Sequence, residues 1–219
     1  MADVVAGRTG SRGRIDKRQA ILDAAFPVFA RRGYAEAGVQ EIAEEAGVAK
    51  PTVYSHFGDK ENLFRAAMAS AADAVLADNL AVIERLRDPG EDLHAALEEV
   101  AYRMLQVCCG ERSLALRWLT YAQVARFPDL IDVVQGRTAK GLGEALADRL
   151  ARLSLSGRLC PCDPARAAEQ LLALLTGPME ARSGLGTRKV PAAEARAVAE
   201  AAVDTFLKAY GTPAGRGRP

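Results

Sequence analysis

Apolar residues recur along most of this chain at the three-and-four spacing that places them on one face of an α-helix. Residues 16–32 are a clear example, with Ile21, Leu22, Ala25, Val28 and Phe29 on one side. The two-residue alternation of a β-strand is missing. Alanine, leucine, glutamate and arginine, which favour helices, fill the long segments. The pattern predicts an all-α fold.

Helix-breaking residues divide this pattern into separate segments. Gly33 follows the first segment, and Asp88-Pro89-Gly90 follows a long fourth one, whose start Asp59 is placed to cap. We expect helices at residues 16–32, 38–46, 51–57, 60–87, 91–109, 112–126, 129–155, 163–182 and 191–210.

The stretch EIAEEAGVAKPTVYSHF, residues 41–57, interrupts a helix only briefly. Gly47 can adopt the left-handed conformation that a sharp helix end requires, and the small side chain of Ala43 lets a second helix cross closely. Pro51 suits the first turn of that second helix, where its missing N–H costs nothing. This arrangement is typical of a helix-turn-helix, although a plain helical hairpin has the same outline.

The second helix of this pair is about two turns long, which is too short for stability on its own. We expect Val53 and Phe57 to pack against the first helix. No acid lies between Gly47 and Gly58. A face with a cation, hydroxyls and an imidazole suits DNA phosphates and base edges. The residues expected on this face are Lys50, Pro51, Thr52, Tyr54, Ser55 and His56.

The same region resembles the N-terminal domain of the TetR family of transcriptional regulators. The resemblance covers residues 14–64 and rests on four short matches: Ile42-Ala43, Ala46-Gly47-Val48, Tyr54-Ser55-His56-Phe57 and Lys60-Glu61-Asn62-Leu63. The chain departs from the family at Ala37-Gly38, where members usually carry threonine or serine. Glycine can still cap the helix, but a side-chain contact to phosphate is lost there.

The resemblance implies a role for each matching residue. Lys50, Pro51 and Tyr54 would face base edges, with Lys50 preferring guanine. Phosphate contacts would come from Thr52, Tyr54, His56 and Lys60, although His56 could equally pack beneath Tyr34. The predicted DNA-binding residues are therefore Lys50, Pro51, Thr52, Tyr54, Ser55, His56 and Lys60.

The family resemblance also implies a domain plan. Residues 14–60 would form the helix-turn-helix DNA-binding domain, and residues 61–210 a helical effector-binding and dimerisation domain. Residues 1–13 and 211–219 would be flexible tails. Residues 117–134 are similar to the AefR-like branch of the family. The implied partners are double-stranded DNA with a near-palindromic operator, a small-molecule effector, and a second copy joined through helices 163–182 and 191–210.

The effector pocket would lie among the helices of residues 60–155, where we see few charges that would be buried, so we expect an apolar or aromatic ligand. Trp118 and Tyr121 carry polar tips that need partners when buried, which favours a pocket role. Each candidate could also be an ordinary core residue. The predicted ligand-binding residues are Tyr102, Leu105, Cys108, Trp118, Tyr121, Ala122 and Phe127. We predict a repressor released by its ligand; a regulator without an effector, or an activator, is the alternative.

Composition adds mainly exclusions. The net charge of +1 over 219 residues does not by itself indicate nucleic acid or a membrane. We find no apolar run that suggests a membrane span and no secretory signal, so we expect a cytoplasmic protein without a membrane partner.

Paired cysteines and two histidines are the remaining candidates for chemistry. Cys108-Cys109 and Cys160-Pro161-Cys162 have no residue or one residue between the cysteines, whereas zinc sites usually have two to four. Redox sensing is a minor alternative. His94 has no evident partner. We therefore expect no metal, no cofactor and no catalytic residues, and we do not expect an enzyme.

Overall fold

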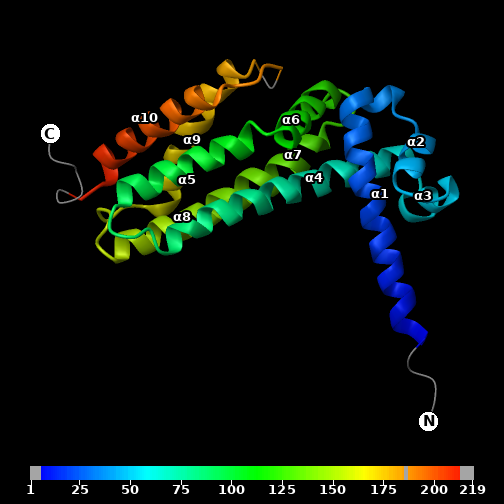
Figure 1. Ribbon diagram of the computed structural model, residues 1–219, viewed down its shortest axis with the longest axis horizontal. Helices are drawn as coiled ribbons and strands as arrows, with labels where there is room; N and C mark the ends of the chain where they lie inside the picture. The colour runs from blue at the N-terminus through cyan, green and yellow to red at the C-terminus, as the bar shows by residue number, and fades with distance from the viewer. Residues whose placement is uncertain (1–5, 185–186, 213–219) are drawn as a thin grey trace, which may run out of the picture. The chain divides into compact units, whose positions relative to one another are not determined.

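The computed structural model describes residues 6–184 and 187–212, and within them it has helices and one isolated β-bridge, between Leu159 and Gly211. The predicted all-α fold is confirmed. Figure 1 traces the helices in chain order. Their bounds are α1 Ala6–Glu36, α2 Val39–Glu45, α3 Lys50–Phe57, α4 Lys60–Ile83, α5 Leu93–Cys108, α6 Glu111–Gln123, α7 Asp129–Gln135, α8 Gly141–Leu155, α9 Pro164–Arg182 and α10 Ala192–Tyr210.

Two short helical segments join these helices. A 3₁₀ turn, η1 (Glu84–Arg87), extends α4, so the predicted helix over residues 60–87 is continuous. A π-helical turn, η2 (Gly136–Lys140), separates α7 from α8, so the predicted helix over residues 129–155 is interrupted. The predicted tails are described only in part, because residues 1–5 and 213–219 lie outside the described range; α1 already begins at Ala6.

The chain forms two compact units. The smaller unit comprises residues 1–71 together with residues 119–134, and the larger unit comprises residues 72–118 and 135–219. The smaller unit therefore contains α1 to α3, the first half of α4, and the chain from the end of α6 to most of α7. The predicted boundary near residue 60 remains a prediction.

The core of the smaller unit contains a cluster of four aromatic rings beside buried aliphatic residues such as Ile21 and Ile42. The ring of Phe64 lies 4.9 Å from that of Phe29, 5.0 Å from that of Tyr34 and 5.4 Å from that of Phe127, between centroids. These rings come from α1, α4 and the segment after α6, so their packing joins residues far apart in the sequence. Gly33 ends the regular helix as predicted, because its φ of 72° and ψ of 171° are non-helical; the chain kinks there and a short helical stretch follows to Glu36.

The turn between α2 and α3 forms as the sequence predicts. Gly47 has a φ of 66°, and the N–H of Val48 donates to the carbonyl oxygen of Ala43 at 2.9 Å. Ala43 is buried, which allows α3 to cross close to α2. Asp59 caps α4, because its Oδ1 accepts a hydrogen bond from the N–H of Asn62 at 2.7 Å. The helix-turn-helix is thus set by local backbone chemistry.

The larger unit has an aliphatic core. Helix α5 packs against α10, and α9 packs against both α8 and α10. Leu146, Leu150 and Val203 are fully buried in this core, and Phe206 contributes its main aromatic ring. Burial of apolar side chains from four long helices holds this unit together.

Helix α4 together with η1 bears on the expectation that the chain has no membrane-spanning segment. Residues 60–87 are long and apolar enough, by length and composition alone, to cross a membrane. Two acids interrupt the apolar stretch, and both are paired: Asp73 accepts from Arg137 at 2.8 Å, and Asp78 accepts from Arg112 at 3.5 Å. These ion pairs suit a helix that packs within a helical protein.

Candidate DNA interface and ligand-binding region

Helix α3 has one buried face and one exposed face. Val53 and Phe57 are 1% and 8% exposed and pack inward, whereas Lys50, Pro51, Tyr54 and Ser55 are exposed. Thr52 and His56, the other two residues of the predicted outer face, are half-buried. The hydroxyl of Ser55 donates to the carbonyl oxygen of Thr52 at 2.8 Å, and the ammonium of Lys50 lies 6.0 Å from the ring centroid of Tyr54. The predicted outer face is accessible to a DNA groove, and its contacts with DNA remain predictions.

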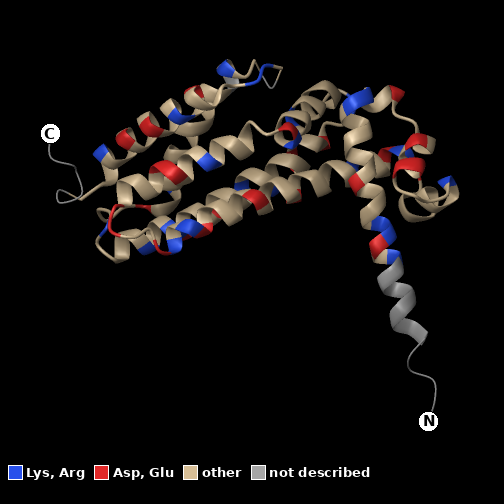
Figure 2. Cartoon of the chain, in the orientation of Figure 1, with Lys and Arg blue, Asp and Glu red and all other residues tan. Residues whose placement is uncertain are grey.

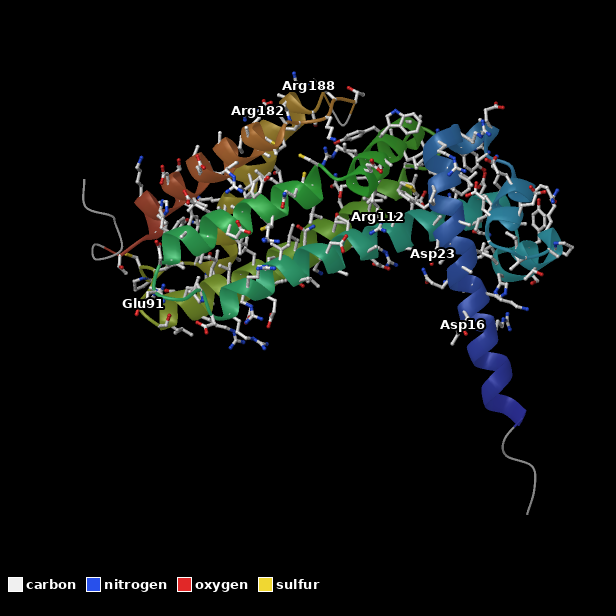
Figure 3. The ribbon with its side chains drawn as sticks, in the orientation of Figure 1. Asp16, Asp23, Glu91, Arg112, Arg182 and Arg188 are labelled. Atoms are coloured by element: carbon white, nitrogen blue, oxygen red, sulfur yellow. The ribbon has the colours of Figure 1, made fainter. Side chains whose placement is uncertain are left out.

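A second basic surface adjoins α3, on α1. Arg14, Lys17 and Arg18 are exposed there, and the guanidinium of Arg18 lies 5.1 Å from the ring centroid of Phe57. The pKa of His56 is lowered mainly by burial and secondly by these three cations. Its imidazole is therefore neutral at pH 7, and a phosphate would accept a hydrogen bond from its ring N–H. Asp16, labelled in Figure 3, is the acid on this stretch. In the sequence these three cations belong to a basic N-terminal stretch that also holds Arg8 and Arg12.

Lys60 is turned toward its own unit. Its ammonium donates to the carbonyl oxygen of Ala35 at 2.9 Å and lies 4.9 Å from the ring centroid of Tyr34. Burial lowers the pKa of Lys60. The side chain therefore fastens the start of α4 to the end of α1, and a phosphate contact would use its remaining N–H groups. Tyr34 packs against Phe29, Phe64 and Phe127, while the ring of His56 pairs with Phe57.

Ion pairs attach the segment after α6 to the start of α4. Arg65 donates to Asp129 at 2.9 Å, and Arg126 donates to Glu61 at 3.1 Å. The guanidinium of Arg126 also lies 4.8 Å from the ring centroid of Tyr34. The hydrogen bond from Arg65 lowers the pKa of Asp129. Sequence reasoning missed this connection, because its partners lie more than sixty residues apart.

The predicted ligand-binding residues occupy different environments. In the larger unit, Leu105 is buried, Tyr102 lies under the guanidinium of Arg196 at 4.0 Å, and Cys108 accepts a hydrogen bond from Arg117 at 3.2 Å. Phe127 instead belongs to the ring cluster of the smaller unit.

The aromatic candidates on α6 are not buried. Trp118 and Tyr121 are 40% and 47% exposed, and Ala122 is exposed beside them. Their polar tips therefore do not depend on buried partners, because both side chains are exposed. Their role as ligand contacts remains a prediction that rests on exposed aromatic surface.

Two cavities lie within the larger unit. One, of about 400 Å³, is a groove over α9 and α10 that includes Leu174, Phe206 and Tyr210. The other, of about 410 Å³, lies where the turn after η1 approaches the end of α8. The seven predicted ligand residues line neither of these two cavities.

The four cysteines are half-buried thiols. They form no disulfide in the described residues. The pKa of Cys109 is raised well above the usual range, mainly by a hydrogen bond with Cys108 and secondly by burial. Burial also raises the pKa of Cys162. Because the thiolate is the form that reacts and binds metals, these shifts argue against the redox alternative.

His94 has partners that the sequence did not reveal. Its Nε2 lies 2.8 Å from Oδ1 of Asp204, on α10, and its Nδ1 lies 3.7 Å from Oε1 of Glu98, on α5. No partner for His94 is evident from the sequence, because Asp204 comes close to it only when α10 packs against α5. Within the described residues this trio is close enough to hold a metal ion. The hydrogen bond with Asp204 raises the pKa of His94, which favours a protonated ring, so we interpret the trio as an ion pair.

Comparison with known families agrees with these features. Residues 21–67 match the model of bacterial regulatory proteins of the tetR family. Residues 95–212, more than half of the chain, match the model of the AefR-like transcriptional repressor C-terminal domain.

Relatives cover most of the chain. The HTH-type transcriptional regulator RutR of Escherichia coli K12 is 32% identical over 158 residues, which is 71% of each chain. A putative TetR-family transcriptional regulator from Mesorhizobium loti MAFF303099 is 31% identical, with a TM-score of 0.84 over 91% of this chain and 98% of its own. The flavonoid-responsive regulator FrrA is 25% identical, with a TM-score of 0.68 over 90% of this chain and 98% of its own.

RutR and FrrA are named as regulators, and the exposed face of α3 is suited to DNA. The chain belongs to the TetR family of transcriptional regulators and is a DNA-binding regulator rather than an enzyme.

Proposed function

We propose that the protein is a homodimeric repressor that leaves a near-palindromic operator when it binds a small apolar or aromatic molecule. The observation that carries the proposal is the exposed face of α3, with Lys50 and Tyr54 outward and no acid from Gly47 to Gly58. Such a face can approach the phosphates and base edges of a major groove without charge repulsion. The matching AefR-like model is described as that of a repressor, which supports the direction of regulation.

A dimer is supported by the surface of α9 and α10. Leu171 and Leu175 are buried in the core of the unit, but Leu172 and Leu174 are only partly covered, and the groove beside Phe206 is apolar on its walls. A second copy packed on these helices would remove this surface from water. Two α3 helices about 34–36 Å apart would then enter successive major grooves of one operator.

The effector class is supported by exposed aromatic surface. Trp118 and Tyr121 lie within one turn on the same face of α6. The relative FrrA is named as flavonoid-responsive, which suits an aromatic ligand. An effector that favours the non-binding dimer by about 5.5 kcal/mol would turn an operator that is almost fully occupied into one that is almost empty. Such binding would act by tilting α4, whose start is fastened to α1 through Lys60.

The proposal is tested by gel-shift titration of the intergenic DNA beside the protein's own gene, with and without aromatic ligands. Lys50→Ala should relax sequence preference by about 1–3 kcal/mol at one base pair, because lysine reads guanine. Lys60→Ala should weaken binding to all sequences alike.

Lys140→Ala is the control, since it removes the same charge from an exposed position on η2 in the larger unit. It should leave DNA binding unchanged. Equal behaviour of the Lys50 and Lys60 variants would contradict the assignment of roles, and the absence of binding to any duplex at low salt would contradict the proposal itself.

The alternative is a regulator without an effector, or an activator. A thermal-shift screen against hydrophobic compounds separates the first from our proposal, since an effector-free regulator gives no stabilisation with any of them. In vitro transcription from the bound promoter separates the second, because an activator raises transcript yield where a repressor lowers it.

A further inference from the structure

Four arginines converge on the cavity at the end of α8. This cavity, of about 410 Å³, is lined by Arg87 of η1, by Arg149 and Arg152 of α8, and by Arg158 just beyond α8. Its size falls within the range of about 300–1,000 Å³ that is typical of small-molecule sites. Basic residues lie in η1 and in the last turn of α8, among the blue segments of Figure 2. The arginines come from two segments about sixty residues apart, so folding alone brings them together.

The cavity is also partly apolar. Leu86 and Leu153 are 3% and 5% exposed, and both line the cavity together with Pro89 of the turn. An apolar wall beside guanidinium groups favours a ligand that has both a charged group and a hydrocarbon part, because each part then meets a matching surface.

The carboxylates of this region only partly balance the arginines. Asp148 is the acid among the lining residues, and it pairs with Arg152 at 2.9 Å. Glu84 is shared by Arg87, at 2.7 Å, and Arg149. Arg149 is 14% exposed, so its charge is the one most removed from water. Two carboxylates thus pair with three of the four guanidinium groups that line the cavity, which leaves these lining residues with more positive than negative charge.

Arg158 carries the least compensated of these charges. Its Nη2 donates to the carbonyl oxygen of Glu91 at 3.0 Å, which holds the side chain in place without a carboxylate bond. Glu91, labelled in Figure 3, does not itself line the cavity. A planar guanidinium offers five N–H donors, so most of those of Arg158 remain available to an oxyanion.

We propose that this arginine cavity binds a small organic oxyanion, a carboxylate or phosphate attached to an apolar group. The oxyanion would accept hydrogen bonds from Arg158 and Arg152, and the apolar group would lie against Leu86 and Leu153. Arginine forks match both carboxylate and phosphate oxygens, so they account for the class of charged group. This site is separate from the aromatic effector surface proposed above and does not depend on it.

The test is isothermal titration calorimetry of the full-length protein with four probes. These are phenyl phosphate, phenylacetate, inorganic phosphate and benzyl alcohol, which separate the anionic from the apolar contribution. We expect phenyl phosphate or phenylacetate to bind at least about tenfold more tightly than either inorganic phosphate or benzyl alcohol.

The double variant R152Q/R158Q should weaken binding of the anionic aromatic probes by at least about tenfold, because each lost charged hydrogen bond costs about 1.5–3 kcal/mol. R112Q is the matched control: Arg112 is an exposed arginine of the same unit outside the cavity, paired with Asp78, and its loss should leave binding unchanged. Circular dichroism checks that each variant is folded. The proposal is overturned if neither aromatic anion binds at millimolar concentration, or if the folded double variant and R112Q bind it as tightly as the wild type.

Discussion

The two units of this protein are stabilised by different means. The smaller unit combines buried aliphatic residues with four rings from three distant segments, and Lys60 and Arg126 lie over Tyr34. The larger unit spreads its core over aliphatic side chains of long helices, of which Leu146 and Leu150 are fully buried. The smaller unit also includes a two-turn helix that is too short to persist alone, whereas long helices share the burial among many contacts. The smaller unit should therefore depend more on single residues.

The largest effect is expected from Phe64→Ala. The side chain is fully buried and contacts three rings, so its loss should lower the free energy of unfolding by about 3–5 kcal/mol. Urea denaturation followed by circular dichroism measures this change. Leu155→Ala, at a position 89% exposed in the larger unit, is the control and should change stability by less than about 0.5 kcal/mol. A loss below about 1 kcal/mol for Phe64→Ala would contradict the central role of the rings.

Glycine-to-alanine substitutions should have opposite signs in the two units. Gly47 has a φ of 66°, so an alanine there should destabilise the protein by about 1–2 kcal/mol although space for a Cβ is present. Gly143 lies inside α8 with open space around it, and an alanine there should stabilise by up to about 1 kcal/mol. Thermal denaturation of both variants measures the sign of each change in stability. Two changes of the same sign would show that the conformation of Gly47 does not affect the stability of the smaller unit.

The smallest effects concern pH, and they too should differ between the units. In the smaller unit, Arg65 lowers the pKa of Asp129, so this pair contributes above the unfolded aspartate pKa of about 3.9 and is lost as pH falls below it. In the larger unit, Asp204 raises the pKa of His94, so that pair contributes below about pH 6.5 and is lost as pH rises through the raised pKa. Each pair is exposed and is worth about 1 kcal/mol or less.

Melting temperatures of D129N and D204N against wild type measure these contributions. D129N should be less stable than wild type at pH 7 and equal to it near the acid limit, whereas D204N should be less stable at pH 6 and equal to wild type at pH 9. A deficit of D204N that grows between pH 6 and pH 9 would exclude a protonated His94.

Local chemistry made much of the smaller unit predictable. Gly47, Pro51 and Asp59 act through backbone conformation and caps within a few residues, and the buried positions Val53 and Phe57 follow from helical spacing. The accessible face of α3 therefore followed from the sequence. The helix stop at Gly33 also followed from the sequence, since its φ of 72° is non-helical, but the short helical stretch beyond it to Glu36 did not.

The sequence by itself determined the helical class, the position of the turn, and a recognition helix without acids, since each depends on neighbours along the chain. Only the tertiary structure decided that Asp204 meets His94, that Arg126 covers Tyr34, and that Arg87 and Arg158 line one cavity. The physical reason is distance along the chain: periodicity shows which face of a helix is apolar, but it does not say which distant helix that face will meet.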